Sequence, residues 1–280
     1  MGNSQSVLHC RGRVLGLEQP VVMGVLNVTP DSFSDGGKFV KLDAAVARGV
    51  QMAEEGAAII DVGGESTRPG SQPVDLHEEL RRVIPVVARL RDHTPAILSV
   101  DTSKPEVMHA AAAAGAAMIN DVRALREPGA LEAAVITGCG VCLMHMLGEP
   151  HTMQDAPEYR DVVADVRRFL ERRVEACLGA GLPAERMVLD PGFGFGKTLE
   201  HNLALLRHLG ELSVAGLPLL AGLSRKSMVG ALTGRPADDR VHGSVALAVL
   251  AAINGARILR VHDVAATIDA LKVVAAFQNA

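Results

Sequence analysis

From residue 21 to near the C-terminus, eight short apolar runs alternate with longer stretches of helical composition. The runs are rich in Val, Ile and Leu, as strands buried on both faces are, and this βα rhythm indicates a parallel sheet with crossover helices. The expected strands cover residues 21–28, 57–62, 96–100, 118–119, 140–146, 187–189, 217–223 and 257–261. The expected helices lie near residues 43–55, 75–92, 105–114, 127–137, 159–180, 198–209, 226–253 (broken near Gly234 and Pro236) and 263–277.

Eight successive βα units favour a (β/α)8 barrel over a chain of two domains. The 280 residues contain no low-complexity linker and no block of like charges, so we expect one domain over residues 1–280. Residues 1–20 precede the first unit, and Gly12 lies there between two short apolar stretches. This pattern predicts an N-terminal β-hairpin, which we expect to close the barrel floor.

Composition excludes several classes of function. A net charge of −4 and only seven aromatic residues, six Phe and one Tyr, argue against nucleic acid as a partner. No run approaches the roughly 18 apolar residues that span a bilayer, so we expect no membrane partner. The four cysteines occur without a signal-peptide pattern and therefore predict reduced thiols in a cytoplasmic protein.

Polar side chains stand at the end of every expected strand. In a (β/α)8 barrel the carboxyl ends of the strands meet at one mouth, where active sites lie. Burying so many polar groups without partners would cost a few kcal/mol each, which makes a purely structural role improbable. The strand-end residues are Asn27, Asp61, Asp101, Asn120, Asp121, His145, Asp190, Ser224, Arg225, Lys226, Arg260 and His262.

The residue types at this mouth predict a ligand with two chemically different ends. The carboxylates of Asp101 and Asp190 and the amide of Asn120 suit a flat heterocycle that carries adjacent N–H donors. Lys226 and Arg260 suit a phosphate group.

Three tempting motifs have simpler interpretations. Residues 192–198 resemble a phosphate-binding P-loop, but Pro191 stands where the first glycine is required. Cys139 and Cys142 form a lone C-x-x-C without a second ligand pair, which favours two small core residues over a zinc site. His145 lies near the end of an expected apolar strand, beside Met144 and Met146, where a core or mouth-lining residue is favoured over a metal ligand.

An ordered series of strand-end motifs resembles the dihydropteroate synthases of folate biosynthesis, a family of pterin-binding enzymes. The resemblance covers residues 6–275 and agrees with the barrel inferred from the strand pattern. The motifs are MGVLNVTPDSFSDGG at 23–37, IIDVGGESTRPG at 59–70, SVDTSK at 99–104, IND at 119–121, LMHM at 143–146, DPGFGFGK at 190–197, GLSRK at 222–226 and RVH at 260–262.

The resemblance implies transfer of an alkyl group from 6-hydroxymethyl-7,8-dihydropterin pyrophosphate to 4-aminobenzoate, with release of pyrophosphate. It implies Mg²⁺ as cofactor, with Asn27 as its protein ligand, and Lys226, Arg260, His262 and Asp101 as the catalytic set. Residues implied in pterin pyrophosphate binding are Thr67, Arg68, Asp101, Asn120, Met144, Asp190, Lys226, Arg260 and His262. Residues implied in the aminobenzoate slot are Phe33, Pro69, Phe195 and Ser224. Asp31 and Asp35 are weaker candidates for metal contacts. The family also implies a homodimer and competition by sulfonamides.

Three alternatives remain open from the residues alone. A pterin-binding methyltransferase domain is another barrel that reads a pterin edge with Asp and Asn. A non-catalytic pterin-binding or scaffolding paralogue, or a purely structural barrel, would need no pyrophosphate site. Retention of Asn27, Arg68, Lys226, Arg260 and His262 together favours the enzyme.

Overall fold

The computed structural model describes residues 6–28, 38–66, 71–148 and 157–278, with residues 38–41 described by their backbone alone. Within these ranges eight parallel strands close into a barrel in the order β10-β3-β4-β5-β6-β7-β8-β9. The expected (β/α)8 barrel is therefore confirmed. The barrel strands are β3 (Val21–Asn27), β4 (Ile59–Gly63), β5 (Ile97–Asp101), β6 (Met118–Asp121), β7 (Gly140–Met144), β8 (Met187–Asp190), β9 (Leu219–Ala221) and β10 (Ala256–Val261).

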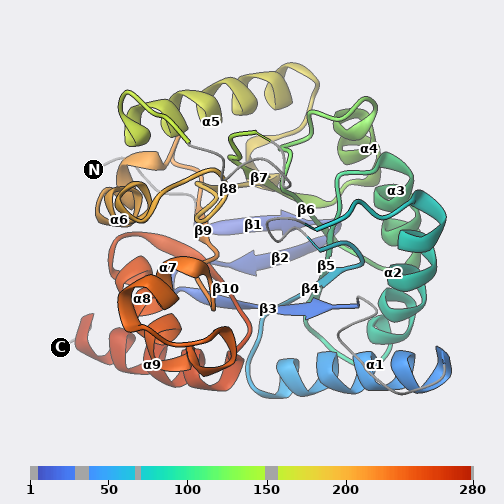
Figure 1. The fold of residues 1–280 in the computed structure, drawn as a ribbon. Helices are drawn as coiled ribbons and strands as arrows, with labels where there is room; N and C mark the ends of the chain where they lie inside the picture. The colour runs from blue at the N-terminus through green and yellow to red at the C-terminus, as the bar shows by residue number, and fades with distance from the viewer. Residues whose placement is uncertain (1–5, 29–37, 67–70, 149–156, 279–280) are drawn as a thin grey trace.

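Helices surround the strands on the outside (Figure 1). The seventh expected helix is two helices, because Gly234 ends the first in a left-handed conformation (φ 70°) and Pro236 follows it. The α-helices are α1 (Lys38–Glu54), α2 (Leu76–Arg91), α3 (Pro105–Ala114), α4 (Ala130–Thr137), α5 (Val162–Gly179), α6 (Leu199–Arg207), α7 (Ser227–Thr233), α8 (Val241–Ile253) and α9 (Val264–Gln278). Short 3₁₀ helices are η2 (Ala184–Arg186), η3 (Leu209–Leu212) and η4 (Ala237–Asp239).

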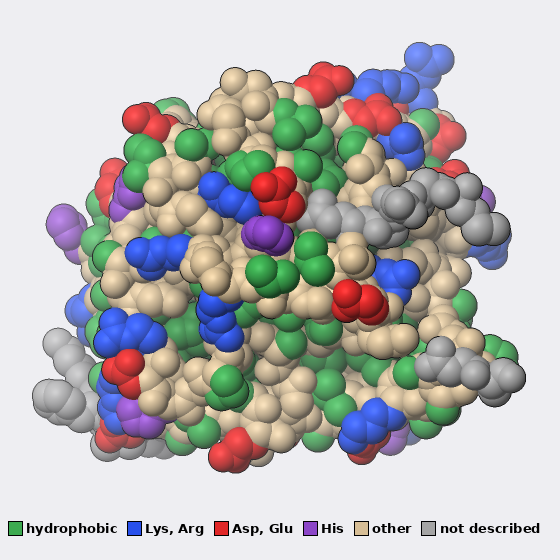
Figure 2. Space-filling model, turned by 180° about the vertical axis from the view of Figure 1, so that it is seen from behind, with side chains coloured by type: hydrophobic (Ala, Val, Ile, Leu, Met, Phe, Trp, Pro, Cys, Tyr) green, Lys and Arg blue, Asp and Glu red, His purple; other side chains and the backbone are tan. Residues whose placement is uncertain are grey.

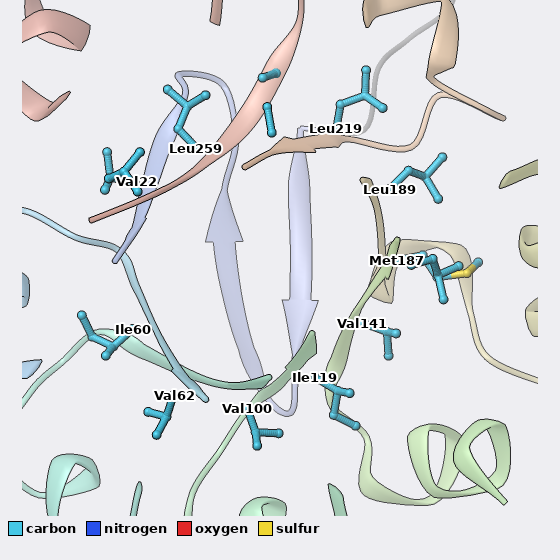
Figure 3. Packing of buried hydrophobic residues seen from close by; sticks show 14 of the residues in the cluster. Val22, Ile60, Val62, Val100, Ile119, Val141, Met187, Leu189, Leu219 and Leu259 are labelled. Atoms are coloured by element: carbon cyan, nitrogen blue, oxygen red, sulfur yellow. The ribbon is translucent and has the colours of Figure 1, made fainter. Parts of the chain in front are cut away.

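The core has two main layers because successive strand residues point to opposite faces. One set of strand side chains, including Val22, Ile60, Ile119 and Leu259, points away from the barrel centre toward the helices (Figure 3). The alternate set fills the lower barrel interior, and its members include Met23, Ile59, Met118, Val188, Leu220 and Ile258. This interior layer leaves the carboxyl ends of the strands as the place where polar groups gather.

The N-terminal hairpin lies at the opposite end, as expected. Strands β1 (Val7–Cys10) and β2 (Arg13–Gly16) pair antiparallel, and Leu8 and Cys10 join the interior cluster. The backbone N–H of Arg11 donates to the carbonyl of Gly138, just before β7, at 3.0 Å. The hairpin therefore closes the barrel floor. All four cysteines are buried free thiols, including Cys139 and Cys142 of the C-x-x-C sequence.

On the face seen in Figure 2, basic, acidic and hydrophobic side chains are interspersed. Among the described residues, the helices all fall short of the length and hydrophobicity required to traverse a bilayer.

Candidate active site

Four strands are joined by side chains inside the mouth of the barrel. Arg260 of β10 donates from Nε to Asp61 Oδ2 of β4 and from Nη2 to Asp101 Oδ2 of β5, at 2.7 Å in each case. Asn120 of β6 donates from Nδ2 to the same Asp61 oxygen at 2.9 Å. Asp61 therefore orients both Arg260 and Asn120 from below.

Burial and charge set the protonation of these groups in opposite ways. Burial is the main cause that raises the pKa of Asp101, to about 7, against the lowering effect of the Arg260 guanidinium. Burial also raises the pKa of Asp190. For Arg260, burial opposes the charge, but the carboxylates of Asp61 and Asp101 prevail and raise the pKa of the guanidinium. Arg260 is thus a permanent cation beside Asp101, whose carboxyl group titrates nearer neutrality.

Lys226 lies against the loop that follows β8. Its ammonium donates to the carbonyl of Phe193 and lies 4.6 Å from the centroid of the Phe195 ring. Burial lowers the pKa of Lys226 to about 8, while the Asp190 carboxyl opposes this effect. The amine is therefore charged at neutral pH but close to the point where it loses its proton.

The loop after β9 is locked to the end of β10. Ser224 Oγ accepts from the backbone N–H of His262 at 3.2 Å and lies 3.1 Å from His262 Nδ1. Arg225 adopts a left-handed backbone (φ 58°) and forms a two-point ion pair with Asp263, with Nε 3.0 Å from Oδ2. A non-glycine residue in this conformation is strained, so the ion pair helps to hold a turn that keeps Ser224 and Lys226, the residues on either side of Arg225, at the mouth.

An apolar wall completes the described part of the site. Val122, Met144, Met146 and Phe195 form a small buried cluster separate from the two main core layers. Met144 ends β7, and Phe195 belongs to the loop after β8. Flat thioether and aromatic surfaces suit contact with the face of a planar ring.

Asn27 ends β3 beside this polar cluster. A Cβ placed on Gly63, the last residue of β4, would lie 3.7 Å from Asn27 Oδ1 and 3.8 Å from Asp101 Oδ2. Both oxygens therefore lie close to Gly63, which presents no side chain to them.

Six residues named from the sequence lie outside the described residues. They are Asp31, Phe33, Asp35, Thr67, Arg68 and Pro69. The others belong to one end of the barrel, on the strands or the loops that follow them.

Sequence reasoning gave no role to two residues that the structure makes prominent. Asp61 is fully buried and supports Arg260 and Asn120; its signal was a charged residue inside the apolar sequence 59–62. Lys197 is 3% exposed, and its side-chain nitrogen has three polar partners. Its signal was the glycine-rich motif whose match to a P-loop fails.

Comparison with known proteins agrees with the barrel fold and with the polar residues at its mouth. Residues 23–262 match the family of pterin binding enzymes. A dihydropteroate synthase from Escherichia coli strain K12 is 54% identical over 273 residues, which are 98% of this chain and 97% of that protein. The solved structure of Xanthomonas albilineans dihydropteroate synthase with 4-aminobenzoic acid has a TM-score of 0.94 and 57% identity, covering 99% of this chain and 100% of that one. Another from that organism, in complex with 7,8-dihydropteroate, has a TM-score of 0.88 and 52% identity, covering 98% of this chain and 99% of that one.

A barrel with paired carboxyl groups and cations at its mouth is the architecture of an enzyme that holds a polar heterocycle and an anion. The chain belongs to the pterin binding enzyme family. Within that family it is one of the dihydropteroate synthases, which are transferases.

Proposed function

We propose that the chain joins 6-hydroxymethyl-7,8-dihydropterin pyrophosphate to 4-aminobenzoate, giving 7,8-dihydropteroate and pyrophosphate. The observation that carries the proposal is the meeting of Asp101, Asn120 and Asp190 with Lys226 and Arg260 at one barrel mouth. Acceptors for a heterocycle and cations for a diphosphate are thus present together, as the two ends of this substrate require.

The pterin edge would lie on the carboxyl side of the mouth. Asp190 ends β8 and is 4% exposed, so its carboxylate can take the paired N–H donors of the 2-amino-4-oxo ring in a dry setting. Asn120 and Asp101 would add an amide and a second acceptor. The thioether of Met144 would contact one ring face, with the guanidinium of Arg260 on the other.

The diphosphate would lie on the cationic side. As the bond from carbon to oxygen breaks, negative charge moves onto the departing pyrophosphate, and the electron-rich dihydropterin carries the positive charge left on the carbon. Arg260 and His262 would stabilise the outgoing negative charge, as would Arg68 from outside the described residues. Lys226, between the Asp190 side and the Phe195 ring, would lie near both substrates.

The nucleophile requires little activation. An arylamine is neutral at pH 7, so its lone pair can attack the methylene carbon and then lose a proton without a strong general base. Phe195 and Ser224 would line its slot, together with Phe33 and Pro69. Exclusion of water matters here because water would convert the same electrophile to the alcohol.

The residues present fit a magnesium ion held mostly by substrate. Asn27, the last residue of β3, offers a hard oxygen at the mouth, and within the described residues no group of three His, Cys, Asp or Glu could form a protein cage for a metal. Magnesium commonly takes one or two protein ligands with phosphate oxygens and waters. When bound, it would supply positive charge to the leaving group.

Two copies of the chain would associate through α8 and α9. Leu250 and Ile253 of α8 are 47% and 52% exposed, and Val273 and Phe277 of α9 are 70% and 79% exposed. Apolar side chains gathered on neighbouring helices are typical of a subunit interface. Light scattering should give twice the 29.4 kDa chain mass, and Phe277→Asp with Val273→Asp should give the single-chain mass; a wild-type monomer would refute the dimer.

We place the enzyme in the cytoplasm, where its thiols stay reduced.

The proposed reaction is tested by pyrophosphate release from purified protein supplied with the pterin pyrophosphate. Release should require both 4-aminobenzoate and Mg²⁺, stop on addition of EDTA, and be inhibited by a sulfonamide in competition with 4-aminobenzoate. Asn27→Ala should raise the Mg²⁺ concentration needed for half-maximal rate. Release without 4-aminobenzoate, at the same rate as with it, would indicate hydrolysis and contradict the proposal.

A further inference from the structure

The glycine-rich sequence 192–197 folds around the side-chain nitrogen of Lys197, its last residue. Lys197 Nζ donates to the carbonyls of Gly192 and Phe195 at 2.9 and 3.0 Å. It also lies 2.9 Å from His145 Nδ1, just beyond β7. A buried lysine with three polar partners is costly to bury and yet fully satisfied, which indicates a requirement for this geometry.

The three glycines of the motif allow the backbone to make this turn. Gly192, Gly194 and Gly196 all have positive φ, between 64° and 77°. A Cβ on Gly192 would lie only 1.9 Å from the carbonyl oxygen of His145, so the loop is pressed against the end of β7. The motif that fails as a P-loop is therefore a clasp closed by the side chain of Lys197, and burial lowers the pKa of this amine well below its usual range.

The outer surface of this clasp carries two groups of the site. The carbonyl of Phe193 accepts from Lys226, and the ring of Phe195 packs against the same ammonium. The backbone N–H of Gly192 donates to Asp190 Oδ1 at 2.7 Å. Loss of the Lys197 amine would free the carbonyls of the loop that it holds and shift Lys226 and Phe195 together.

His145, just beyond β7, is suited to a fixed rather than a switching role. Burial, followed by the charge of Lys197, lowers the pKa of His145 to about 2, so the imidazole is neutral. Its Nδ1 can then accept from the Lys197 amine. The edge of the ring packs at 85° against Phe169, with centroids 4.9 Å apart, which holds its orientation.

We propose that Lys197 is a positioning residue for the reaction: by clasping the loop after β8, it sets the place of Lys226 and Phe195 and thereby the aminobenzoate slot. The proposal rests on the proposed function, from which the roles of Lys226 and Phe195 come. Lys197 is enclosed by the loop and by His145, and it acts through the loop rather than on the substrates.

The test compares Lys197→Met, in the loop after β8, with a matched variant just before the start of β8. Arg186, just before β8, likewise holds backbone carbonyls, with Nε 2.8 Å from that of Cys139, but it lies on the floor side. Lys197→Met should raise the KM for 4-aminobenzoate about tenfold or more and lower kcat, with a smaller change in the KM for the pterin pyrophosphate. Arg186→Met should lower the thermal midpoint while both KM values stay within about twofold of wild type. An unchanged KM for 4-aminobenzoate in folded Lys197→Met would overturn the proposal.

Further variants, at His145 and Asn202, cover the case in which Lys197→Met does not fold. Asn202 Oδ1 accepts from the N–H of Gly194 at 2.8 Å and supports the same loop from α6. His145→Gln keeps an acceptor near Lys197, and should retain more of the aminobenzoate affinity than His145→Ala, while Asn202→Ala should show a milder form of the Lys197→Met effect. If His145→Gln, His145→Ala and Asn202→Ala all kept the wild-type KM for 4-aminobenzoate, the proposal would be contradicted. Absence of dihydropteroate from the wild-type protein would instead contradict the proposed function, so the two failures are distinguishable.

Discussion

Arg260 Nη2 lies 2.7 Å from Asp101 Oδ2, although the two residues belong to strands that are separated in the barrel by β3 and β4. Both side chains are largely removed from water, with exposed fractions of 20% and 8%. Because Nε of the same guanidinium pairs with Asp61, one guanidinium is the partner of two carboxyl groups. Both carboxyl groups are therefore held in place before any substrate binds.

Removal of that cation should be costly. Arg260→Met leaves two buried carboxyl groups without their partner, and we expect the free energy of unfolding to fall by about 3–5 kcal/mol. Arg235→Met is the matched control, because it breaks an exposed pair with Asp239 and should cost less than about 1 kcal/mol. Urea unfolding measures both, and a similar small loss in the two variants would count against the buried network.

The acid side of the pH profile should report Asp101. Its pKa is raised to about 7, chiefly by burial, so the carboxylate form that accepts N–H donors becomes depleted below that pH. We expect kcat/KM for the pterin pyrophosphate to fall as pH decreases through about 7, and Asp101→Asn to have a lower but flatter profile. The substrate's own ionisation is common to both proteins. A variant profile parallel to that of wild type would assign the acid limb to another group.

The alkaline side should report Lys226. Burial lowers the pKa of its ammonium to about 8, so the charged form is lost above that pH. We expect kcat/KM to decline above about pH 8 in the wild type and to remain level in Lys226→Arg, whose guanidinium keeps its charge. Persistence of the same decline in Lys226→Arg would show that Lys226 is not its source.

The close approach of Gly192 to β7 gives a prediction about the fold. A methyl group there would lie 1.9 Å from a backbone oxygen, whereas a Cβ on Gly234, at nearly the same φ (70° against 69°), meets nothing within 4 Å. Gly234→Ala should cost about 1–2 kcal/mol from backbone strain alone. Gly192→Ala should cost clearly more and abolish turnover. Equal thermal midpoints for the two variants would contradict the described packing.

The barrel was predictable from sequence because strands buried on both faces leave continuous apolar runs. Individual bounds moved where polar residues continue a strand: residues 118–119 were expected, but β6 extends to Asp121. The bounds of β9 also differ from the expected ones: the strand covers only Leu219–Ala221, whereas residues 217–223 were expected. Backbone pairing, rather than hydrophobicity, decides such ends.

The site was predictable as a set of residues but not as a network. A strand-end position places Asp101, Asp190 and Arg260 at one mouth, since all parallel strands end there. Which carboxylate meets which cation depends on side-chain direction, and this is why Asp61 was named without a role. Lys197 could not be assigned a role from the sequence because two of its three partners are backbone carbonyls, which leave no pattern in the sequence.

The most direct test of the account is quantification of 7,8-dihydropteroate made from the pterin pyrophosphate, 4-aminobenzoate and Mg²⁺ by wild-type protein and by Lys226→Ala. The account predicts dihydropteroate and pyrophosphate in equal amounts from the wild type, and a rate at least about 100-fold lower from the variant. Failure of the wild type to make dihydropteroate, while it still binds the pterin pyrophosphate, would contradict the account and favour a non-catalytic or methyl-transferring pterin protein.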